Sequence, residues 1–131
     1  MHFRSIFFLL VSFVILSCNG QAAENIKMIE AKDFAETMNT TKNPQILDVR
    51  TPEEFTQGHI DNAANVNWLG DRFVADAEKF DKTKPVFVYC KSGRRSKKAT
   101  EKLQELGFKN IYELKGGFMK WSAAGLNKPT E

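Results

Sequence analysis

Apolar and polar positions alternate along the chain in a way that predicts five short strands separated by helices. Four-residue apolar runs bounded by turn residues are typical of strands buried inside a sheet. The expected strands cover residues 26–29, 46–49, 63–66, 86–89 and 111–114. Apolar residues spaced three or four apart predict helices between them, over about 31–38, 71–80 and 118–124, with a short one from Pro52 and another ending at Gly107. This order implies an α/β fold with a largely parallel sheet covered on both faces.

The central strand, 86–89, delivers a cysteine to a tight loop. Cys90 is followed by Ser92, Gly93 and Ser96, and then by a helix. The amide groups of such a loop point inward, and the start of a helix adds partial positive charge. The loop therefore favours an anion or a thiolate at the carboxyl end of the strand, where ligands bind in folds of this class.

The loop is also strongly basic. Five of the eight residues from Lys91 to Lys98 are Lys or Arg. Cations in the first turn of a helix oppose its dipole at roughly 0.3–1 kcal/mol each, so positive charge should have a use here. Lowering the pKa of Cys90 and attracting an anionic substrate are two such uses. The alternative is a buried structural cysteine beside a solvated basic surface.

Composition fits one globular domain over residues 24–131. The chain has 131 residues, of which 42% are hydrophobic and 27% are charged, and its net charge is +3. Apart from the loop, its basic residues are dispersed and form no broad stripe with aromatic residues. This pattern argues against nucleic-acid binding.

Residues 1–23 resemble a targeting segment. A short basic start precedes an apolar stretch at 6–16, which is too short for a membrane span of about 20 residues and suits a signal peptide. Residues 15–18, Ile-Leu-Ser-Cys, resemble a lipobox, which would make Cys18 a lipidation site. Cleavage near Ala22 is the alternative route, and we favour the lipoprotein. Either route predicts export to the periplasm or cell envelope, the first with a lipid anchor to a membrane.

The chain contains only two cysteines, Cys18 and Cys90. Once Cys18 is lipidated or removed, Cys90 is a lone thiol and no internal disulfide can form. A lone thiol in an exported protein is open to oxidation, and a catalytic nucleophile explains it better than packing does.

Four motifs in order resemble those of the rhodanese family. They are Leu-Asp-Val-Arg at 47–50 with Pro-Glu-Glu-Phe at 52–55, Gly-His-Ile at 58–60 with Ala-Ala-Asn-Val at 63–66, Cys-Lys-Ser-Gly-Arg-Arg-Ser at 90–96, and Leu-Lys-Gly-Gly at 114–117 with Trp121. The resemblance spans about residues 26–126. It implies a single-domain rhodanese with a three-layer fold around a mostly parallel five-stranded sheet.

The resemblance also implies a reaction. Cys90, as a reachable thiolate, would take a sulfane sulfur from an anionic donor such as thiosulfate, and a thiol or cyanide would accept it. The expected substrate-binding residues are those of the loop: Lys91, Ser92, Gly93, Arg94, Arg95 and Ser96. The reaction needs neither metal nor other cofactor, and we expect a monomer.

Two other functions are known for domains that resemble this one. Rhodanese-fold phosphatases and arsenate reductases use a loop one residue longer, with arginine at the place that Ser96 has here, and a loop of this length suits sulfur better. The other is a non-catalytic rhodanese-like binding module in the cell envelope.

The remaining polar and aromatic residues of these motifs have structural interpretations. We expect Asp48 and Arg50 to support the site, with an ion pair from Arg50 to Glu54. His59 should hydrogen-bond within its turn rather than act as a base. Trp68 and Trp121 should lie in the core or in a pocket wall.

Overall fold

The computed structural model describes residues 25–127. The expected targeting segment, 1–23, with Cys18 in it, lies outside the described residues. Within 25–127, no helix combines the length and the apolar character that a membrane crossing requires.

Five parallel strands form one sheet in the order β1–β5–β4–β2–β3. They are β1 (Ile26–Ile29), β2 (Gln45–Asp48), β3 (Ala64–Asn65), β4 (Val86–Tyr89) and β5 (Ile111–Leu114). β4 lies at the centre and all four of its residues are buried, as its unbroken apolar run predicts. β3 is shorter than expected because only Leu47 and Asp48 of β2 pair with it.

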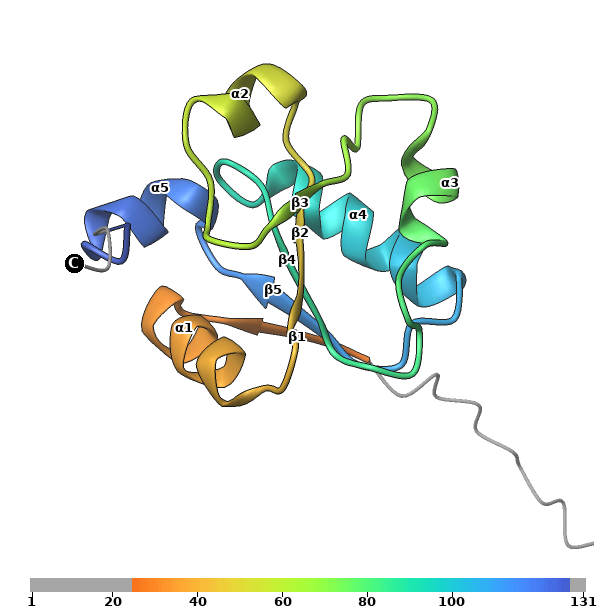
Figure 1. Cartoon of the computed structure of the whole chain (residues 1–131), viewed down its shortest axis with the longest axis horizontal. Helices are drawn as coiled ribbons and strands as arrows, with labels where there is room; N and C mark the ends of the chain where they lie inside the picture. The colour runs from red at the N-terminus through yellow and green to blue at the C-terminus, as the bar shows by residue number, and fades with distance from the viewer. Residues whose placement is uncertain (1–24, 128–131) are drawn as a thin grey trace, which may run out of the picture.

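Helices cover both faces of the sheet (Figure 1). They are α1 (Ala31–Thr40), α2 (Pro52–Thr56), α3 (Phe73–Ala77), α4 (Arg94–Glu105) and α5 (Gly117–Ala123). One buried cluster joins α3 and α4 to the sheet, and a second joins α1 and α5 to the other face. The predicted three-layer α/β architecture is therefore confirmed.

The starts of α2 and α3 show how local sequence determines where a helix begins. α2 begins with a capping box, in which Thr51 and Glu54 each bond the other's backbone N–H. α3 is shorter than the predicted 71–80 helix. Its N-cap residue, Arg72, makes no side-chain capping hydrogen bond, and Val74 in its first turn is 41% exposed.

A buried polar network joins β2 to β4. The Asp48 carboxylate accepts hydrogen bonds from the Arg50 guanidinium at 2.6–3.0 Å and from the Tyr89 hydroxyl at 2.6 Å. The Tyr89 oxygen also accepts the backbone N–H of Ile60 at 3.0 Å, and Arg50 donates to the Gly58 carbonyl at 2.7 Å. Because Arg50 is taken by Asp48, the expected Arg50–Glu54 ion pair was wrong.

This network fixes the segment from Gly58 to Ile60 against the carboxyl end of the sheet. Burial, with the nearby charge of Asp48, raises the pKa of Tyr89 far above its ordinary value. The hydroxyl therefore keeps its proton and serves as a permanent donor to Asp48. Asp48 and Arg50 thus have the structural role that the sequence predicted.

We expect Tyr89→Phe to lower the free energy of unfolding by about 1–3 kcal/mol, because it leaves the Ile60 N–H without its partner in a buried position. Urea unfolding measures this. Tyr112→Phe is the matched control on the same sheet, since no hydrogen bond of the Tyr112 hydroxyl occurs within residues 25–127, and it should cost less than about 0.5 kcal/mol. Equal losses in the two variants would contradict the role given to the Tyr89 hydroxyl.

Candidate active site

The loop from Cys90 to Ser96 joins β4 to α4. Gly93 precedes the helix with a φ of 107°, a conformation that favours glycine. The start of α5 holds the base of the loop, because the N–H groups of Phe118 and Met119 donate to the Cys90 and Lys91 carbonyls at 2.8 and 3.1 Å.

Gly117 makes this contact between α5 and the loop sterically possible. Its φ is 62°, and a Cβ there would lie 2.5 Å from the carbonyl oxygens of Cys90 and Lys91. Only a glycine fits so close to the loop backbone. The Gly-Gly pair of the last sequence motif therefore acts on the geometry of the cysteine loop.

The sulfur of Cys90 lies among hydrogen-bond donors. It accepts the Gly93 N–H at 3.0 Å and lies 3.4 Å from the hydroxyl oxygen of Ser96. Burial raises the pKa of the Cys90 thiol, but hydrogen bonds from Ser96, Gly93 and Ser92 outweigh it, so the pKa lies below its ordinary value. The loop thus favours the thiolate, as its sequence predicted.

The thiol is less accessible than expected. Only 1% of Cys90 is exposed, because it packs in the buried cluster with Val88 and Ala99. The expectation of an openly reachable thiol was therefore wrong. Beside the loop lies a pocket of about 350 Å³, the mouth pocket, lined by Arg50, Glu54, Gln57, Gly58, Lys91, Phe118, Met119 and Ser122.

The predicted substrate-binding residues divide into two groups. Lys91, Ser92 and Arg94 are exposed, and Lys91 and Arg94 form no ion pair within the described part of the chain. Gly93 and the buried Ser96 surround the sulfur instead. The loop therefore directs hydrogen-bonding groups towards the sulfur of Cys90 and cationic side chains towards solvent.

Arg95 has a partner that the sequence did not reveal. It makes two hydrogen bonds to the Glu54 carboxylate, at 2.6 and 2.9 Å, with side chains 21% and 27% exposed. This bidentate pair ties α2 to the cysteine loop. The hydrogen bond to Glu54 is the largest cause of a raised pKa of Arg95, and the charge of Cys90 adds to it.

Glu113 on β5 was not among the predicted site residues. This side chain is 5% exposed and accepts the Ser96 hydroxyl proton at 2.9 Å. Burial raises its pKa above the ordinary value. An acidic residue within an otherwise apolar strand was the available signal.

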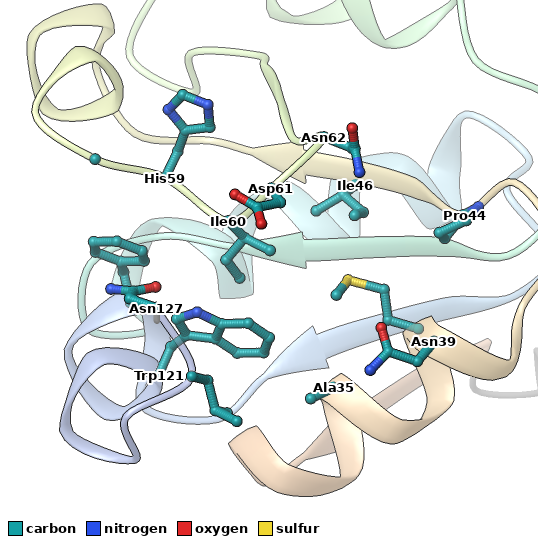
Figure 2. Close-up of a pocket in the computed structure, with 14 residues that line it drawn as sticks. Ala35, Asn39, Pro44, Ile46, His59, Ile60, Asp61, Asn62, Trp121 and Asn127 are labelled. Atoms are coloured by element: carbon teal, nitrogen blue, oxygen red, sulfur yellow. The ribbon is translucent and has the colours of Figure 1, made fainter. Parts of the chain in front are cut away.

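A second pocket lies between α1, α5 and the segment 58–62 (Figure 2). Its volume is about 590 Å³, and neither Cys90 nor any other residue of the cysteine loop lines it. Trp121 forms part of its wall, as predicted. His59 also lines it, with its ring nitrogen 2.9 Å from the Phe55 carbonyl and its ring stacked on Phe55, which confirms the expected turn hydrogen bond.

Within residues 25–127, no three His, Cys, Asp or Glu side chains lie close enough together to bind a metal ion. The reactive group that the arrangement presents is the Cys90 thiol. A buried sulfur with a lowered pKa, held by amides and flanked by cations, suits nucleophilic attack on an anion.

The Glu54–Arg95 pair should make stability depend on acid. The hydrogen bond from Arg95 lowers the pKa of Glu54 from 4.5 to about 2. Its stabilisation is then complete at neutral pH and is lost as the pH falls from about 4.5 to about 2. We expect Glu54→Gln to cost about 1 kcal/mol at neutral pH and progressively less in acid.

Urea unfolding at a series of pH values between about 7 and 3 measures this loss. Glu53→Gln, which removes the exposed neighbouring carboxylate, is the control and should change stability little at any pH. A difference between wild type and Glu54→Gln that stays constant with pH would contradict the assignment.

The chain is similar to proteins that are named as sulfurtransferases. The family model described as Rhodanese-like domain matches residues 30–124. A mitochondrial Schizosaccharomyces pombe protein, provisionally named a thiosulfate sulfurtransferase, is 35% identical over 86% of this chain and 91% of its own length. The thiosulfate sulfurtransferase GlpE of Coxiella burnetii is 41% identical over 60% of this chain and 71% of its length. The chain spans less than a third of two other, larger relatives.

Solved structures agree with this likeness. The crystal structure of a rhodanese-related protein from Thermoplasma volcanium is 31% identical, with a TM-score of 0.66, and the match covers 76% of this chain and 93% of that one. This chain combines a five-stranded parallel sheet with the cysteine loop and with the Gly-Gly turn that packs against the loop. The chain belongs to the rhodanese-like domain family.

Proposed function

We propose that this domain is a sulfurtransferase that carries a sulfane sulfur on Cys90 as a persulfide. The observation that carries the proposal is the position of the Cys90 sulfur, which lies among the donors of the loop and has a lowered pKa. The relatives named as thiosulfate sulfurtransferases support the same chemistry, and thiosulfate is the donor that we propose.

The reaction has two displacement steps. The Cys90 thiolate attacks the outer sulfur of thiosulfate, a new S–S bond forms, and the S–S bond of the donor breaks with its electron pair leaving on sulfite. A thiolate or cyanide acceptor then attacks the outer sulfur of the persulfide and regenerates the Cys90 thiolate. This is double-displacement covalent catalysis, for which ping-pong kinetics are expected.

The loop residues divide the work of this reaction. The backbone amides of Ser92, Gly93 and Ser96 stabilise the anionic sulfur. The exposed cations Lys91 and Arg94 attract the sulfite end of the donor, and Arg95 contributes positive charge while bound to Glu54. Since Cys90 is 1% exposed, the donor reaches the sulfur only when the groups above it move.

The same burial favours a second candidate function. A rhodanese-like module that keeps its cysteine in the core and serves mainly to bind a partner would also have a thiol that is 1% exposed. The two functions differ in one measurable respect, which is whether sulfur becomes covalently bound to Cys90.

We expect incubation with thiosulfate to add one sulfur atom to the protein, as seen by intact mass, and we expect thiosulfate with cyanide to yield thiocyanate. Cys90→Ser should abolish both, because the nucleophile is gone, while Cys18→Ala should leave both unchanged. A folded wild-type protein that gains no sulfur and forms no thiocyanate would favour the binding module.

We further propose that the chain is exported and anchored to a membrane through a lipid on Cys18. The proposal rests on the sequence of residues 1–23. Radiolabelled palmitate should be incorporated into the protein when it is expressed in bacteria, and Cys18→Ala should abolish the labelling while Cys90→Ser keeps it. Labelling that survives Cys18→Ala would overturn the lipid anchor.

A further inference from the structure

A chain of buried hydrogen bonds leads from Cys90 away from the mouth of the loop. The Cys90 thiol donates to the Ser96 hydroxyl oxygen at 3.4 Å, and the Ser96 hydroxyl donates to the Glu113 carboxylate at 2.9 Å. All three residues are buried, with exposed fractions of 1%, 0% and 5%. The carboxylate is thus connected to the thiol through a single hydroxyl group.

Glu113 connects this chain of hydrogen bonds to the surface. It lines a surface pocket of about 570 Å³, the rear pocket, whose other lining residues are Ile26, Met28, Gly93, Lys97, Thr100, Glu101 and Gln104. Of these, Gly93 is the one that belongs to the cysteine loop. The rear pocket shares no lining residue with the mouth pocket, so the two openings are separate.

We propose that Glu113 accepts the proton of Cys90 through Ser96, and that the thiol and the carboxyl group share one proton inside the domain. This inference deepens the proposed function, because it supplies the step that makes the nucleophile. The S–H bond of Cys90 breaks as a new O–H bond forms on Ser96. The former hydroxyl proton of Ser96 passes to Glu113, and no charge enters or leaves the site.

The product of this transfer satisfies every group along the chain. The thiolate then accepts from the Ser96 hydroxyl as well as from the Gly93 N–H, and the neutral Glu113 donates to the Ser96 oxygen. Because Cys90 is 1% exposed, its thiol cannot release its proton directly to solvent, and the hydroxyl of Ser96 offers a path through the interior. The shifts in pKa agree, since that of Cys90 lies below and that of Glu113 above its ordinary value, which brings the two groups closer in proton affinity.

The charged residues that act on the pair all belong to α4. Lys97 and Glu101 on α4 face Glu113 and act on it in opposite senses. The strand neighbours of Glu113, Met28 on β1 and Val88 on β4, carry no charge. Arg95 is the cation whose charge interacts with Cys90. Glu113 is thus the acid that is hydrogen-bonded to the hydroxyl that reaches the sulfur.

The test is the pH dependence of alkylation at Cys90 by iodoacetamide, followed by peptide mass spectrometry of the full chain so that Cys18 is counted separately. Glu113→Gln keeps the shape of the side chain and its bond to Ser96 but removes the charge. We expect wild-type Cys90 to become alkylatable in two steps, the first in mild acid, where its proton passes to Glu113. Glu113→Gln should lose this first step and titrate once, with alkylation in mild acid about tenfold slower, because no carboxylate is left to accept the proton.

Two further variants identify the route. In a Ser96→Ala background, Glu113→Gln should change the alkylation rate less than about twofold, since the connecting hydroxyl is absent. Glu101→Gln removes a nearby carboxylate that has no bond to Ser96, and it should leave the acid step unchanged. An acid step that persists in Glu113→Gln, the same change with and without Ser96, or an equal change in Glu101→Gln would each overturn the proposal.

The outcome is independent of sulfur transfer, because the assay contains no sulfur donor. If Cys90 alkylation depends on Glu113 as expected but the wild-type protein gains no sulfur from thiosulfate, the proposed function is refuted and the proposal of a shared proton stands. Protein that gains sulfur but shows no Glu113 effect would do the reverse.

Discussion

The active site depends on hydrogen bonds that favour the thiolate form of a buried cysteine. Removing a charged group from water is costly unless hydrogen bonds replace the water. At Cys90 this replacement comes from backbone amides, which carry no net charge and are fixed by the fold. The parallel sheet, the left-handed Gly93 and the helix that follows all serve to bring those amides to one point.

The end of β4 separates two polar networks on opposite faces of the sheet. Tyr89 points to the α1 and α5 side, where it joins Asp48 and Arg50, and Cys90 points to the α4 side, where it joins Ser96 and Glu113. Adjacent residues of a strand point to opposite faces of the sheet, so the dipeptide Tyr89–Cys90 supplies one residue to each network. The first network is rigid and structural. The second contains the groups that can exchange a proton.

The fold could be predicted from the sequence because its signals are local. All five strands lie within one residue of the expected bounds at each end, since apolar runs such as 86–89 favour a buried position. The capping box of Thr51 and Glu54 and the glycine before α4 were readable for the same reason. The cysteine loop itself was identified as the site from its composition.

The pairings within the site could not be predicted in the same way. Glu54 and Arg95 are 41 residues apart, and Ser96 and Glu113 are 17 apart. Helical spacing instead suggested Arg50 as the partner of Glu54, but Asp48, two residues away, holds Arg50. Which partner a charged side chain finds depends on how the strands are ordered, as does the burial of Cys90. Neither is encoded in a short stretch of sequence.

The position of α5 has an evolutionary consequence. Its first turn packs closely against the backbone of the loop at Gly117 and donates hydrogen bonds to it from Phe118 and Met119. Met119 and Ser122 also line the mouth pocket. Met119 is 58% exposed, so its side chain is free to vary while its backbone N–H continues to bind the loop. Substitutions of the Met119 side chain during evolution can therefore change the lining of the mouth pocket without removing the backbone hydrogen bond that holds the loop.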